Sequence, residues 1–125
     1  MKDIVDYFFN NVNNHGNSLA VVENSRKTTY SELGMLVKKI ASFIKQKNTS
    51  YPKVAIYLPQ GSESYAAMIA TLYSGGFYTP INLNAPLNRQ FEILNQFQPD
   101  FVISKYNLFK PLSKKYPNIK LVDID

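Results

Sequence analysis

The sequence predicts an α/β fold: a mainly parallel, doubly wound sheet of the flavodoxin or Rossmann type, with flanking helices and a small N-terminal hairpin. The strongest observation is a strand–helix–strand unit. An apolar run at 54–58 meets Pro59 to Ser62, an almost uncharged helical segment follows at 62–74, and a second apolar run occupies 77–81. Such a crossover places its two strands parallel or close in one sheet. Further strand-like runs then alternate with helical patterns, as in doubly wound sheets.

The N-terminal segments predict a docking helix, a hairpin and a second helix. Residues 3–12 carry apolar side chains at helical spacing, and the polar run 13–17 then breaks the pattern. The segment 19–30 has turn residues at its centre, which predicts an antiparallel hairpin. A helix near 31–47 is expected to begin with Ser31 as its N-cap and to turn one apolar stripe toward the sheet. Pro52 lies beyond the end of this element, because it cannot continue a helix.

The central helix at 62–74 carries so little charge that we expect it to be buried on several sides. Ser62 stands where its N-cap should be. Gly75 and Gly76 follow its last turn, so we expect them to end the helix, with a positive φ angle at one of them.

Three further elements are expected after the central unit. Pro86 near the start of an amphipathic run predicts a helix over 85–98. The short apolar run at 101–104 predicts a buried strand, and 119–124 predicts the final strand. Between them, residues 106–116 are a helix candidate that Pro111 interrupts.

Composition predicts one domain over residues 1–125 and excludes several classes of function. The length suits a single core. With no cysteine, disulfides, thiolate metal sites and thiol nucleophiles are excluded. The net charge of +5 comes mainly from lysines that fit solvated helix faces. The sequence has no basic stripe interleaved with aromatic residues, so we expect no nucleic-acid partner. No apolar run has membrane-spanning length, and acids replace the apolar core of a signal peptide, so we expect a cytoplasmic location without a membrane partner.

Three segments together resemble the adenylate-forming enzymes, which include acyl-CoA synthetases, luciferases and the adenylation domains of nonribosomal peptide synthetases. Thr29 to Leu33 matches the family's Thr-Tyr-x-Glu-Leu stretch, and Leu72 to Pro80 matches Leu-x-x-Gly-x-x-Tyr-x-Pro. The segment 84–89, followed by a helix and then 99–104, looks like the family's next helix and strand. The resemblance covers residues 18–104, and the order and spacing of the segments carry it.

The resemblance implies an ATP- and magnesium-dependent ligase that joins a carboxylate to AMP and passes the acyl group to a phosphopantetheine thiol, on a carrier protein or coenzyme A. The family grips the ATP phosphates with a Thr/Ser/Gly-rich loop carrying a lysine. No glycine occurs between Asp100 and Asp125, so that loop is absent in its usual form. We therefore expect an N-terminal, non-catalytic fragment of a larger enzyme, with no cofactor bound by this chain alone. Its expected partners are the remainder of the enzyme, a carrier protein and a second copy of the chain.

Gly76 to Asn82 looks more like the amino-acid-activating branch, which uses carrier proteins. Asn82 replaces a frequent Asp of that branch, and Tyr73-Ser74-Gly75 replaces its frequent Lys-Ala-Gly, so the branch is less well supported than the family. Two alternatives remain open. One is a stand-alone flavodoxin-like binding or regulatory module, and the other is a structural subunit that completes a partner's sheet.

No residue is assigned a catalytic, cofactor-binding or metal-binding role. Gln60-Gly61-Ser62 lies where open α/β sheets often bind phosphate, but one glycine without a following Gly-Lys-Ser/Thr indicates an ordinary helix start. His15, the only histidine, lies in a polar loop with no second metal ligand nearby. Asp100 fits a turn or cap. The central tyrosines are expected to pack in the core or at its boundary, with hydroxyls on polar partners; they are Tyr57, Tyr65, Tyr73 and Tyr78.

Overall fold

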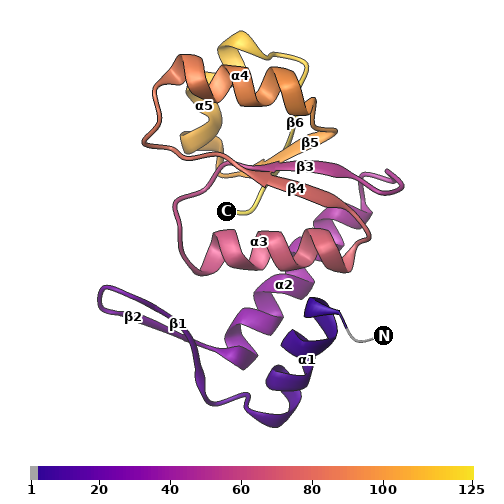
Figure 1. Ribbon diagram of the computed structural model, residues 1–125, viewed down its shortest axis with the longest axis vertical. Helices are drawn as coiled ribbons and strands as arrows, with labels where there is room; N and C mark the ends of the chain where they lie inside the picture. The colour runs from indigo at the N-terminus through magenta and orange to yellow at the C-terminus, as the bar shows by residue number, and fades with distance from the viewer. Residues whose placement is uncertain (1–2) are drawn as a thin grey trace.

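A parallel sheet forms the centre of the structure, a computed structural model that describes residues 3–125 (Figure 1). Its strands are β3 (Lys53–Ile56), β4 (Phe77–Pro80), β5 (Phe101–Ser104) and β6 (Lys120–Asp123). They lie in the order β4-β3-β5-β6, and each neighbouring pair is parallel. This order is the flavodoxin-like one, in which the chain first steps to one side of the starting strand and then to the other. The predicted fold class is confirmed.

Helices cover both faces of the sheet (Figure 1). On one face lie α2 (Tyr30–Lys45) and α3 (Ser62–Tyr73), with α1 (Ile4–Asn14) packed outside them. On the other face lie α4 (Leu87–Phe97) and α5 (Tyr106–Lys115). The predicted hairpin forms a separate two-stranded sheet from β1 (Leu19–Glu23) and β2 (Arg26–Thr29). Among residues 3–125, no helix is both long enough and apolar enough to cross a bilayer.

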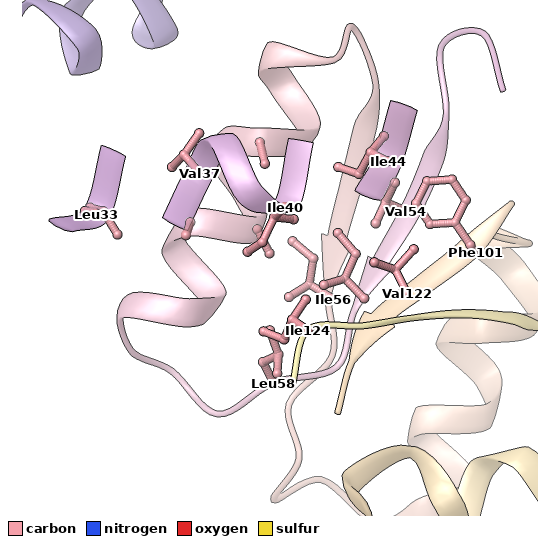
Figure 2. Close-up of a cluster of buried hydrophobic side chains, with 14 of the residues drawn as sticks. Leu33, Val37, Ile40, Ile44, Val54, Ile56, Leu58, Phe101, Val122 and Ile124 are labelled. Atoms are coloured by element: carbon pink, nitrogen blue, oxygen red, sulfur yellow. The ribbon is translucent and has the colours of Figure 1, made fainter. Parts of the chain in front are cut away.

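The unbroken apolar run of β3 follows from burial on both faces. Val54 and Ile56 point into the cluster beneath α2 and α3, where they meet Ile40 of α2 (Figure 2). Ala55 and Tyr57 point into the opposite cluster, beneath α4 and α5. Alternate residues of a strand face opposite sides, so a strand covered on both sides must be apolar at nearly every position. Full burial of each branched side chain stabilises the fold by roughly 1.5 to 3 kcal/mol.

Both predicted N-caps are wrong by one or two residues. The cap of α2 is Thr29, whose hydroxyl accepts a hydrogen bond from Glu32 N–H at 3.2 Å, while the Glu32 carboxylate accepts one from Thr29 N–H at 2.9 Å. This reciprocal box needs a glutamate three residues after the cap, which Thr29 has and Ser31 lacks. Helix α3 is preceded by Gly61, so Ser62 is its first helical residue.

The prediction that two glycines end α3 is confirmed. Gly75 has a φ of +78° and donates its N–H to the Leu72 carbonyl at 3.0 Å. Gly76 donates to the Thr71 carbonyl at 2.9 Å. These two bonds form a Schellman motif, which satisfies the last carbonyls of the helix. At Pro111 the prediction of an interrupted helix is wrong, because Pro111 lies inside a continuous α5.

Candidate functional site

The carboxyl ends of β3 and β5 are the place where this topology would hold a ligand. The chain leaves β3 toward α3 on one face and leaves β5 toward α5 on the other (Figure 1). Open α/β sheets bind ligands in the crevice at such a switch point. Here hydrogen bonds join the residues that follow β3 and those at the end of β5 directly across this switch point. Tyr57 N–H donates to the Ile103 carbonyl at 2.9 Å, and the Ser104 hydroxyl donates back to the Tyr57 carbonyl.

The start of α3 also lies at this edge, and two main-chain donors there, those of Gly61 and Ser62, have partners within the molecule. Gly61 N–H donates to the Ser64 hydroxyl at 3.0 Å. Ser62 N–H donates at 2.7 Å to Oε1 of Glu23, which is the last residue of β1. A helix N-terminus favours an anion, and here the Glu23 carboxylate takes the place that a phosphate would take. An added Cβ at Gly61 would collide with that carboxylate, so the close approach depends on glycine.

Lys105, directly after β5, forms ion pairs at the same edge of the sheet. Its ammonium lies 2.9 Å from a carboxylate oxygen of Glu63 in α3 and 3.6 Å from Asp125, beyond β6. The hydrogen bond to Glu63 raises the pKa of Lys105 above its usual value. The bridge therefore joins three separate segments, although partial exposure to solvent limits its contribution to stability.

We expect the Glu23 contact to be lost in acid. The hydrogen bond from Ser62 N–H lowers the pKa of Glu23 below its usual 4.5. Because the folded-state pKa is depressed, the contribution to stability is complete above pH 4.5 and is lost as pH falls through the folded-state value. Glu23→Gln should therefore unfold at lower urea concentration than the parent at pH 7, and the gap should close in acid. The same gap in acid as at neutral pH would contradict this.

An uncharged pocket of about 680 Å³ lies beside this edge, between the ends of β3 and β4 and the outer side of α3. Leu58, Met68 and Ile81 supply apolar walls, and Asn82 and Asn84 supply amides. Of the described residues that line it, none is an Asp, Glu, Lys or Arg. The pocket is large enough for a small molecule, but its lining lacks a cation that would bind phosphate.

Gln90 of α4 fixes the loop that forms one wall of this pocket. Its side chain is fully buried, and its Oε1 accepts a hydrogen bond from the Tyr57 hydroxyl at 2.8 Å. Its Nε2 lies within hydrogen-bonding distance of the carbonyls of Asn82 and Leu83, both at 3.3 Å, and of Ala85 at 3.0 Å. Burial raises the pKa of Tyr57, which keeps its hydroxyl protonated as a donor. Sequence reasoning missed Gln90 because its partner Tyr57 lies 33 residues away.

The other candidates lie apart from this edge. His15 is an exposed residue just after α1. Asp100 has the expected turn role: its carboxylate accepts a hydrogen bond from Lys53 N–H at 2.8 Å, at the amino end of β3. Tyr65 accepts a hydrogen bond from the Gln60 amide, whereas Tyr73 is half-exposed and packs its ring edge-on to Phe9. Within residues 3–125, no three His, Asp or Glu side chains cluster as metal ligands would. The prediction that this chain has no catalytic or cofactor-binding residue stays a prediction.

Comparisons with known proteins agree with the resemblance. The chain is 27% identical over 95 residues to the bassianolide nonribosomal cyclodepsipeptide synthetase of Beauveria bassiana, an alignment covering 75% of this chain and 3% of that synthetase. The fold of this chain matches that of a four-domain nonribosomal peptide synthetase bound to AMP and glycine, with a TM-score of 0.86 and 21% identity. The match covers 99% of this chain and 9% of the other.

A second solved structure is itself an N-terminal subdomain. The N-terminal subdomain of Klebsiella oxytoca NpsA, in complex with 3-hydroxybenzoyl-AMSN, matches with a TM-score of 0.74 and 26% identity, over 83% of this chain and 27% of that one. The chain thus spans a small part of the relatives that it matches. The family described as AMP-binding enzyme matches residues 8–123, nearly the whole chain. The chain therefore belongs to the family of AMP-binding enzymes.

Proposed function

We propose that this chain is the N-terminal, non-catalytic portion of an ATP-dependent, AMP-forming ligase that activates a carboxylate, of the amino-acid adenylation type. The family match over residues 8–123 carries this proposal. The similarity to a nonribosomal cyclodepsipeptide synthetase and a nonribosomal peptide synthetase favours the amino-acid branch. ATP, magnesium and a phosphopantetheine thiol acceptor would serve the complete enzyme, and residues 1–125 would form one domain of it.

The geometry of the sheet edge supports an inactive isolated chain. Nucleotidyl transfer needs backbone donors and a cation on the α-phosphate as charge builds up. Two donors at the start of α3, the N–H groups of Gly61 and Ser62, already bind Ser64 and Glu23. The ammonium of Lys105, the cation at this edge, already pairs with Glu63 and Asp125. Activity would thus need groups that the rest of an adenylation domain supplies.

Exchange of labelled pyrophosphate into ATP tests the proposal. The isolated chain should show no exchange with any of the proteinogenic amino acids or with aryl acids. A longer polypeptide in which this chain is continued by the remainder of an adenylation domain should exchange with at least one of them. Exchange by the isolated chain that is lost in Ser62→Ala would make the Gln60-Gly61-Ser62 turn a nucleotide site and overturn the proposal. Failure of the longer, folded polypeptide with every acid would contradict the ligase assignment.

A further inference from the structure

A second pocket, of about 670 Å³, lies at the amino end of the sheet, opposite the candidate site. Helices α2 and α3 both end on this side, where β3 and β4 begin (Figure 1). The second half of α2, the end of α3 and the loop 48–50 form its walls. Lys38 and Lys45 supply its charge, so we call it the basic pocket. Its apolar surface comes from three side chains: Ala41, Ile44 and Tyr73.

The positive charge of the basic pocket is unbalanced. Of the described residues that line it, none is an Asp or Glu. Between Glu32 and Glu63 the sequence has no acid and five lysines, which are Lys38, Lys39, Lys45, Lys47 and Lys53. Neither lysine of the pocket takes part in an ion pair formed within residues 3–125. A cation in the last turn complements the helix dipole, which accounts for Lys45 but not for Lys38, two turns earlier.

Tyr51 holds an exposed aromatic ring at the rim of the basic pocket. It follows Ser50, which lines the pocket, and its ring lies beside Gly75, which follows Ser74 of the opposite wall. The side chain is 75% exposed, and its φ of +49° lies in the left-handed region that bulky residues rarely adopt. Burial therefore does not explain this strained conformation. Exposed aromatic side chains are common anchors for a partner, and backbone strain is concentrated at such sites.

We propose that the basic pocket binds an acidic segment of a partner protein, with carboxylates on Lys38 and Lys45 and an apolar side chain between them. The two lysines are seven residues apart, so they lie on one face of α2, about 10 Å apart along its axis. The Lys38 ammonium lies toward α1, 5.8 Å from the centroid of the Phe9 ring. A peptide with separated carboxylates meets both cations, whereas a single phosphate would draw Lys38 away from Phe9.

A nucleic acid fits the basic pocket less well than a peptide does. The C-termini of α2 and α3 end at the pocket, and each carries about half a negative charge. A nucleic-acid backbone, charged at every phosphate, would be repelled by them, whereas a peptide places carboxylates only at the lysines. The two arginines of the chain, Arg26 and Arg89, lie in β2 and α4 and not at this pocket. The inference does not depend on the proposed ligase function.

Two synthetic peptides, Glu-Glu-Leu-Glu-Glu and the neutral Gln-Gln-Leu-Gln-Gln, test the site on the whole, isotope-labelled chain. The acidic peptide should shift the amide resonances of the loop 48–51 with a Kd of roughly 1 mM, and salt should weaken it. The neutral peptide should bind about tenfold more weakly. Equal binding of both peptides, or no shift at this loop up to about 10 mM, would overturn the proposal. Tighter binding of tripolyphosphate or oligothymidylate at the same loop would also overturn it, in favour of a phosphate ligand.

Charge reversal with a matched control locates the site. The double variant Lys38→Glu/Lys45→Glu should weaken binding of the acidic peptide about tenfold. The control, Lys110→Glu/Lys114→Glu, makes the same change of charge at exposed positions of α5, on the other face of the sheet, and should weaken it less than about twofold. Circular dichroism checks that both variants are folded. Equal weakening by the two variants would show a general effect of net charge and would contradict the proposed site.

Tyr51→Asn separates binding from folding. Asparagine tolerates a positive φ, so the variant should unfold at higher urea concentration than the parent. Loss of the ring should weaken binding of the acidic peptide about threefold. A variant that is less stable than the parent and binds the peptide equally well would show that Tyr51 serves the fold and not the partner.

Discussion

Gly76→Val is expected to lower the free energy of unfolding by about 3 kcal/mol. A Cβ at this position would collide with the Pro52 carbonyl oxygen and lie 2.9 Å from Cγ of the Pro52 ring. Relief by movement is restricted, because the same carbonyl accepts the Phe77 N–H that joins β4 to β3, and Pro52 is itself buried. Equilibrium urea unfolding measures the loss.

Gly75 provides the matched control for this prediction. Its φ is +78°, but the nearest atom to an added Cβ is Cδ1 of Tyr51, at an ordinary 3.9 Å. Gly75→Ala should therefore cost only the backbone strain, about 1 kcal/mol, and Gly75→Asn less, because asparagine tolerates this conformation. A larger loss for Gly75→Ala than for Gly76→Val would show that conformation, and not the contact with Pro52, decides the effect.

Sequence patterns predicted the elements whose formation depends on residues close together in the sequence. The unbroken apolar run at 54–58 already reflects burial on two faces, and the glycine pair already marks the end of α3. The helix starts were less well predicted, because several hydroxyl residues stand near each one. Only the distance to a glutamate distinguishes Thr29 from Ser31, and this glutamate, Glu32, is also part of the family's Thr-Tyr-x-Glu-Leu stretch.

The polar contacts at the carboxyl edge of the sheet could not be predicted in the same way. Glu23 and Ser62 are 39 residues apart, and nothing in the hairpin sequence indicates that its last carboxylate reaches the α3 N-terminus. Lys105 likewise meets Glu63 and Asp125 only because β5, α3 and the end of β6 converge there. Such contacts follow from topology, so a sequence can place the segments without showing which side chains meet.

Gln90 has exposed neighbours on α4 and reads as a surface residue in the sequence. In the structure it is 1% exposed and joins β3 to the loop 82–85. A buried amide with all its partners satisfied rigidifies the segments that it joins. This side chain therefore holds the loop wall of the uncharged pocket together with the loop's own hydrogen bonds from Ala85 N–H to the Asn82 carbonyl and from Asn84 N–H to the Asn82 side chain.

Gln90→Leu is expected to lower the free energy of unfolding by about 3 kcal/mol, because it leaves the Tyr57 hydroxyl and the loop carbonyls unpaired at similar side-chain volume. Tyr57→Phe removes only the hydroxyl and should cost about 1 kcal/mol. In the Gln90→Leu background, Tyr57→Phe should cost nothing or should stabilise, because the hydroxyl that it removes has no partner there. Urea unfolding of the four proteins gives this coupling, and amide exchange in the loop 82–85 should accelerate only where Gln90 is replaced. Additive losses, with unchanged exchange in the loop, would show that the hydrogen bonds of Gln90 do not hold the pocket wall.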